Sequence, residues 1–171
     1  MPGPLYQFLQ QDHERLDDLL KRSVAGSPAV ELGPYALFRA GLLRHIGMEE
    51  KILLPTARRL RDGEPLPIAK RLRADHAALA SLLVPTPTGD IIATIRDILA
   101  EHNPLEEGAG GMYELCERLA AAELEALIAR LHAAPEVTVA PHFDGPRVQA
   151  HIEKLLRDRS ESNRGDGTGS S

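Results

Sequence analysis

A short pattern of histidines and acidic residues occurs twice in this chain of 171 residues, and it constrains the possible folds more than any other feature. The two copies read Asp12-His13 with His45-x-x-x-Glu49-Glu50, and Asp75-His76 with His102-x-x-x-Glu106-Glu107. Each copy places a lone histidine on one segment and a histidine four residues before a glutamate on the next. The duplicated unit supplies four imidazoles and two carboxylates, a set suited to a pair of metal ions.

Apolar residues recur at helical spacing in four segments, at about residues 5–25, 34–62, 67–84 and 88–132. Breaks rich in proline and glycine separate these segments. Because short connections join antiparallel neighbours, we predict an all-α fold, an up-down-up-down antiparallel four-helix bundle with a C-terminal extension.

The chain divides into three regions by composition. Residues 1–132 are predicted to form the bundle, and residues 133–159 a loop with a short helix at 148–157, packed on or near it. Residues 160–171 are rich in glycine and serine, and we expect a disordered tail there.

The candidate metal ligands lie on the apolar stripes of their helices and should point inward. They are His13, His45, Glu49, His76, His102 and Glu106. At about 100° per residue, a glutamate four positions after a histidine lies only about 40° around the helix, which selects Glu49 over Glu50 and Glu106 over Glu107. Burying six ionisable groups costs several kcal/mol each unless they are paired or bind metal.

Each motif also has a plainer interpretation. A single buried histidine is usually a hydrogen-bonded core residue, and a lone His-x-x-x-Glu is usually a surface pair. Asn103-Pro104-Leu105-Glu106 can also be read as the cap and first turn of a restarted helix, with Glu106 as the capping-box glutamate. The repetition of the whole set favours metal ligation.

Composition excludes several classes of function. The net charge of −5 argues against nucleic-acid and anionic-membrane partners, and no apolar segment is long enough to cross a bilayer. Cys116 is the only cysteine, which excludes an internal disulfide and metal sites with two or more sulfur ligands. With no export signal at the N-terminus, a reducing cytoplasm is the expected location.

Imidazole and carboxylate ligands without sulfur suit iron, manganese or zinc, and spacing does not choose among them. The ligand pattern, with the phrases HIGMEEKILLP and HNPLEE, closely resembles hemerythrin-like (HHE cation-binding) domains over about residues 5–130. The resemblance implies a cofactor of two iron ions, a non-haem di-iron centre with carboxylate and oxo or hydroxo bridges. It also implies that O₂, hydrogen peroxide or nitric oxide is the small-molecule partner.

The pattern departs from oxygen-carrying hemerythrins at one ligand. Those proteins have a fifth histidine four residues from the one on the third helix, where this chain has Leu72 and Ala80 around His76. Counting ligands for two six-coordinate irons then leaves about two open positions, which favours turnover over reversible carriage if no tyrosine fills one. We assign no catalytic residue; Tyr113, seven residues after Glu106, is a candidate for a pocket or redox role.

Two other functions compete with peroxide or nitric-oxide chemistry. One is an oxygen, redox or iron sensor, with the segment after Ala133 as effector. The other is a ferroxidase-like protein that handles iron, although no acidic entry path is evident. Glu50 and Glu107 are expected to accept the outer N–H of ligand histidines. His142 is a further candidate, as an extra ligand or part of a lid.

Overall fold

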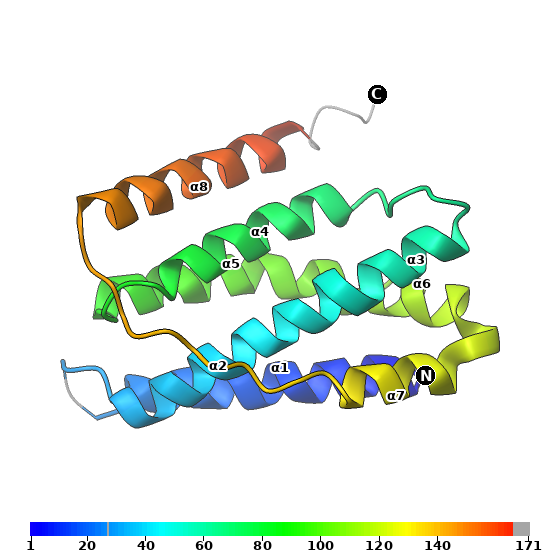
Figure 1. Ribbon diagram of the computed structural model, residues 1–171, viewed down its shortest axis with the longest axis horizontal. Coiled ribbons are helices and arrows are strands. Elements are labelled where there is room, and N and C mark those ends of the chain that lie inside the picture. Colours follow the sequence, from blue (N-terminus) through cyan, green and yellow to red (C-terminus); the bar gives the residue numbers. More distant parts are fainter. Residues whose placement is uncertain (27, 166–171) are drawn as a thin grey trace.

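A computed structural model describes residues 1–26 and 28–165, and every regular element in them is a helix (Figure 1). The elements are α1 (Pro4–Ser23), α2 (Leu32–Met48), the π-helix η1 (Glu49–Leu53), α3 (Leu54–Leu60), α4 (Ala69–Leu82), α5 (Gly89–Glu107), α6 (Met112–Leu119), the 3₁₀-helix η2 (Ala121–Glu123), α7 (Leu124–His132) and α8 (Pro146–Gly165). The prediction of an all-helical fold is confirmed for these residues. None of their helices combines the length and apolarity needed to cross a membrane.

Local sequence explains where the main helices begin and how they pair. Proline in the first turn of α1 has a backbone angle already suited to a helix. Thr88 caps α5, because its Oγ1 accepts a hydrogen bond from the backbone N–H of Ile91 (3.2 Å). Helix α1 packs against α2, and α4 packs against α5, so each copy of the sequence repeat lies on one such helix pair, with Glu49 and Glu50 at the start of η1, directly after α2.

Apolar spacing marks residues 88–132 as one helical segment, but the glycine-rich run at 108–111 disfavours a continuous helix, and the structure divides the segment there. Helix α5 ends at Glu107, and the turn that follows contains Gly108, Ala109, Gly110 and Gly111. Gly110 has a φ of 73°, which a residue with a side chain rarely adopts. Three shorter elements, α6, η2 and α7, follow in place of a continuous helix.

Helix α8 is longer than the predicted helix at 148–157, and it includes residues 160–165, for which the composition predicts a disordered tail. That part of the tail prediction is wrong. Helix α8 lies along α4 (Figure 1). Its side chain Ile152 is buried and belongs to one of the two apolar clusters of the core. The connection from α7 to α8 is held against α2 by Arg39, whose Nη1 donates to the carbonyl of Ala140 (2.7 Å). Residues 166–171 lie outside the described residues.

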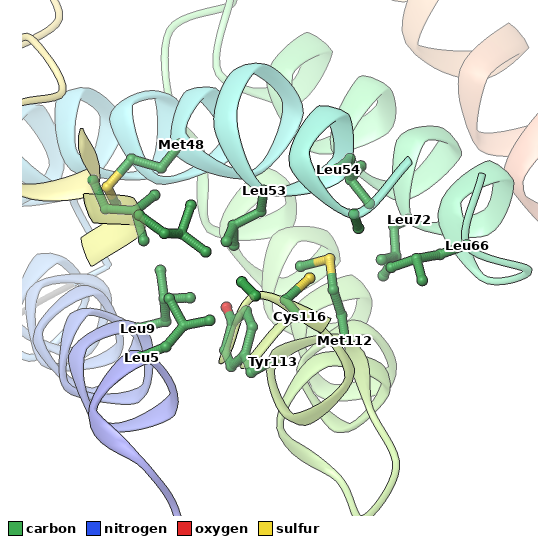
Figure 2. Packing of buried hydrophobic residues seen from close by; sticks show 14 of the residues in the cluster. Leu5, Leu9, Met48, Leu53, Leu54, Leu66, Leu72, Met112, Tyr113 and Cys116 are labelled. Atoms are coloured by element: carbon green, nitrogen blue, oxygen red, sulfur yellow. The ribbon is translucent and has the colours of Figure 1, made fainter. Parts of the chain in front are cut away.

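Two apolar clusters fill the interior. The α6-side cluster includes Leu5, Leu9, Leu53, Met112 and Cys116 (Figure 2). The α8-side cluster includes Leu20, Phe38, Leu79, Ile95 and Ile152. Along α1, His13 falls between Leu9 of the first cluster and Leu16 of the second, and His76 falls likewise between Leu72 and Leu79 on α4. The polar site therefore lies between two apolar regions.

Candidate metal centre

The six residues predicted as ligands come together in the interior as two overlapping groups. His13 and His45 form the first group with Glu49 and Glu106, and His76 and His102 form the second with the same two glutamates. In each group one donor atom from every residue lies within 4.8 Å of the others. The structure therefore has buried histidine–glutamate clusters that can hold metal ions.

Both glutamates face the two groups at once. Glu49 directs Oε1 towards His45 Nε2 (3.2 Å) and Oε2 towards His76 Nε2 (3.0 Å). Glu106 directs Oε2 towards His13 Nε2 (3.3 Å) and Oε1 towards His102 Nε2 (2.9 Å). This is the arrangement that a carboxylate bridging two metal ions requires.

The outer nitrogen of each of the four candidate histidines contacts a carboxylate, to which it can donate. These pairs are His45 Nδ1 with Asp12 (2.8 Å), His102 Nδ1 with Asp75 (2.9 Å), His76 Nδ1 with Glu50 (2.8 Å) and His13 Nδ1 with Glu107. Because a carboxylate only accepts, each Nδ1 must carry a hydrogen, so a neutral imidazole has its lone pair on Nε2, facing the site. The four outer carboxylates thus select the tautomer that binds metal.

Glu50 and Glu107 occupy the outer positions expected from the sequence, but Asp12 and Asp75 were missed. The signal was present, because an aspartate precedes the first histidine in both copies of the repeat. The sequence does not show which histidine each aspartate contacts. In the structure it is the histidine of the paired helix, and not the histidine that directly follows the aspartate in the chain.

Arginines stand behind three of the four outer carboxylates. Arg15 contacts Asp12 (2.8 Å) and Arg73 contacts Glu50 (3.2 Å), both from the molecular surface. Asp75 instead accepts from Arg159 Nε (2.7 Å), a largely buried side chain that belongs to α8. The C-terminal helix is thereby connected, through Asp75, to the ligand candidate His102.

The chemistry of the buried atoms fits a bound metal. Glu49 and Glu106 are fully buried, and His45, His76 and His102 are at most 3% exposed. Within the described residues, Glu49 Oε2, His76 Nε2 and Glu106 Oε1 make no well-aligned hydrogen bond, although Glu49 Oε2 lies 3.0 Å from His76 Nε2 and Glu106 Oε1 lies 2.9 Å from His102 Nε2. All three atoms belong to residues of the second group, and a metal ion there would satisfy them together.

Electrostatics without metal favour charged forms of both ligand types. Burial lowers the pKa of His13, but hydrogen bonds to Glu106 and Glu107 outweigh it and raise the pKa to about 10. Burial also lowers the pKa of His102. The charge of Glu106 and the hydrogen bond to Asp75 outweigh this effect and raise the pKa to about 9. Burial and Glu106 raise the pKa of Glu49, yet His45 and His76 bring it down to about 2. The metal-free site therefore holds protons that a metal must displace.

Tyr113 of α6 reaches the first group. Its hydroxyl donates to Glu49 Oε1 (2.7 Å) and lies 3.0 Å from His13 Nε2 and 3.1 Å from His45 Nε2. Burial, and then the charges of Glu106 and Glu49, hold the pKa of this phenol well above its usual value. The second group has no such hydroxyl among the described contacts, so the two halves of the centre differ.

Other candidates lie outside the two groups. Tyr6 donates to the backbone carbonyl of Glu107 (2.9 Å), and the ring of His142 stacks near Tyr35. Cys116 packs in the α6-side cluster, where burial raises the pKa of its thiol to about 12.

The capping-box interpretation of Glu106 is wrong. Helix α5 continues through Pro104 to Glu107 without a restart, and the carboxylate of Glu106 faces Tyr113 and the histidines.

Comparisons with models of known protein families, with curated proteins and with solved structures found no match to this chain. The assignment of function therefore depends on the site itself.

Proposed function

We propose that this protein is a hemerythrin-like, non-haem di-iron protein that binds O₂ or reacts with peroxide or nitric oxide. The proposal includes an up-down-up-down four-helix arrangement of α1, α2, α4 and α5 around the metals. The observation that carries it is that Glu49 and Glu106 each direct one carboxylate oxygen to each pair of histidines. A single ion would not need two glutamates placed in this way.

His13 and His45 would hold one metal ion, His76 and His102 the other, and Glu49 and Glu106 both. Two neighbouring ions of variable valence can together exchange two electrons with a small oxygen species. The ligand set without sulfur suits iron but also manganese or zinc, and the choice of iron rests on the resemblance seen in the sequence.

The chain's own residues orient the ligands and close one end of the site. The outer carboxylates fix each imidazole by its Nδ1–H, and such partners typically change metal affinity by about 10–100-fold when they are lost. Tyr113 holds a proton at its hydroxyl, within reach of Glu49, and the α6-side cluster shields the site at that end.

Metal analysis and optical spectra test the proposal. Protein produced in iron-rich medium should contain close to two irons per chain. The anaerobically reduced protein should change its spectrum on addition of O₂, peroxide or nitric oxide. A reproducible single ion per chain, or retained zinc with no response to these molecules, would contradict the proposal.

A second candidate, a redox or iron sensor, is favoured by one specific observation. Arg159 connects α8 to His102 through Asp75, so a change at the metals can reach an element outside the four ligand helices. In a sensor, exposure of α8 should differ between the reduced and oxidised protein. If protection of α8 from hydrogen exchange is the same in both states, this candidate fails.

A further inference from the structure

The site is closed on one side and open on the other. Tyr113 and the α6-side cluster cover it at one end. At the other end a cavity of about 510 Å³ begins at the donor residues and is lined by α1, α2, α4 and α5. His13, His45, Glu49, His76 and His102 all form part of its wall, so a molecule in the cavity would touch the metal ligands.

The cavity is too large for the smallest partners alone. A water molecule takes up about 30 Å³ of liquid, whereas cavities of about 300–1,000 Å³ are typical of sites for small organic molecules. A volume of about 510 Å³ therefore suits a small organic molecule.

Beyond the donors most of the buried wall is aliphatic, and Asn103 adds one polar side chain, whose Oδ1 has no hydrogen-bond partner among the described residues. The aliphatic part is formed mainly by Leu16, Leu20, Leu42, Ile46, Leu79 and Leu99. These side chains contact apolar groups well and offer no hydrogen bonds, so the ligand must have an apolar body. Its reactive polar group belongs at the other end, beside the histidines.

The mouth carries charges of both signs. Asp17, Arg96 and Asp97 line it and are exposed, and Asp17 also pairs with Lys21 (2.5 Å). Because no single sign of charge dominates the entrance, it gives no preference for an anionic or a cationic ligand. A neutral molecule fits this entrance best.

We propose that the cavity binds a neutral, apolar organic hydroperoxide, with its –OOH group at the metal ligands and its hydrocarbon body on the aliphatic wall. This inference rests on the proposed peroxide chemistry and names its substrate class. Reduction of the hydroperoxide breaks the O–O bond, takes up two electrons and two protons, and yields one alcohol and one water. The two electrons correspond to the oxidation of two ferrous ions to ferric, so one turnover needs no other reductant.

Two variants on α5 separate the cavity from the helix surface. Ala100 lines the mouth, whereas Ala93 lies two turns earlier on α5 and does not line it; both are exposed. Ala100→Trp should block entry of a bulky molecule, and Ala93→Trp is the matched control. Because neither position is in the core, both variants should fold and keep the wild-type metal content.

The test uses reduced, iron-loaded protein with cumene hydroperoxide or hydrogen peroxide, and follows iron oxidation and formation of cumyl alcohol. Ala100→Trp should slow the reaction with cumene hydroperoxide by at least about tenfold and leave hydrogen peroxide within about twofold. Binding of cumyl alcohol, measured by calorimetry, should weaken in the same variant and not in Ala93→Trp.

The outcomes distinguish this inference from the function on which it rests. If hydrogen peroxide reacts but cumyl alcohol does not bind and Ala100→Trp changes nothing, the inference is overturned and the proposed function stands. If neither peroxide oxidises the iron, the peroxide chemistry and the hydroperoxide substrate both fall, even where cumyl alcohol binds.

Discussion

At the scale of single residues, the two glutamates and the four histidines are not equivalent. Glu49 and Glu106 belong to both donor groups, whereas each histidine belongs to one. Loss of a glutamate should therefore affect both ions, and loss of a histidine mainly one.

Glu49→Gln should lose both metal ions, because the variant removes a negative charge shared by the two groups. His76→Ala should retain about one ion per chain, since the first group keeps all its donors. Glu50→Gln is the matched control: it alters only the outer partner of His76, so it should keep the stoichiometry with affinity lower by about 10–100-fold. Metal analysis after dialysis measures all three, and full loading of Glu49→Gln would contradict a bridging role.

Tyr113→Phe tests whether the phenol is a metal ligand. If its oxygen binds ferric iron in the first group, the oxidised protein should absorb in the visible through phenolate-to-iron charge transfer, and the variant should lose that band. Tyr6→Phe is the control, because this ring packs edge-on against Tyr113 while its hydroxyl contacts only the carbonyl of Glu107. An unchanged visible spectrum in Tyr113→Phe would show that the hydroxyl serves only as a hydrogen-bond donor.

Much of this site could be predicted from residue spacing. Helical periodicity placed the six candidates on inward faces and separated Glu49 from Glu50, since both follow from about 100° per residue. The role of Tyr113 could not be predicted with the same rule. It lies on α6, beyond the turn at 108–111, so its position depends on how that turn redirects the chain.

At the scale of elements, the two copies of the repeat place their shared glutamates, Glu49 and Glu106, in different helical contexts. The π-helix η1 begins at Glu49 and is followed by α3, whereas helix α5 ends one residue after Glu106. A π-helical turn adds a residue per turn and commonly lies at functional sites. The sequence predicted helix at both places, but the i→i+5 pattern of η1 depends on packing that propensities do not describe.

Helix α8 is the element whose contribution to the site can be measured most directly. Arg159→Gln removes the charge that holds Asp75, so α8 should show faster hydrogen exchange and the second group should release its metal sooner. Arg157→Gln on the same helix is the control, because Arg157 is exposed and has no ion pair among the described residues. Equal metal release rates in the two variants would show that α8 only packs against α4.

At the scale of the whole molecule, six buried ionisable groups lie between two apolar clusters, so stability should depend strongly on metal and on pH. Without metal, the charged histidines and carboxylates stabilise one another. With metal, the imidazole protons are replaced, and the dependence on pH changes with them.

The metal-free protein should be most stable at about pH 4.5–6.5. The pKa values of His13 and His102 are raised to about 10 and about 9, so their contribution is complete below about 6.5 and is lost as the pH rises through those values. The pKa values of Asp12 and Glu49 are lowered to about 2, so their contribution is lost as the pH falls towards 2. Melting temperatures measured across the pH range test both the loss of stability at high pH and the loss at low pH. The metal-loaded protein should not lose stability at high pH. A melting temperature that rises from pH 6.5 to 9.5 in the metal-free protein would contradict this assignment.

The outer carboxylates also say how the two halves of the chain are related. Asp12–His45 and Asp75–His102 lie within the first and second helix pairs, whereas Glu50–His76 and Glu107–His13 cross between them. The crossing contacts are reciprocal, since each half gives the glutamate of one contact and the histidine of the other. Subunits of a two-fold symmetric dimer meet in this way. The two halves of the chain are thus arranged like the subunits of a dimer that are joined into one polypeptide. Neither half contains all the residues of a donor group without the other.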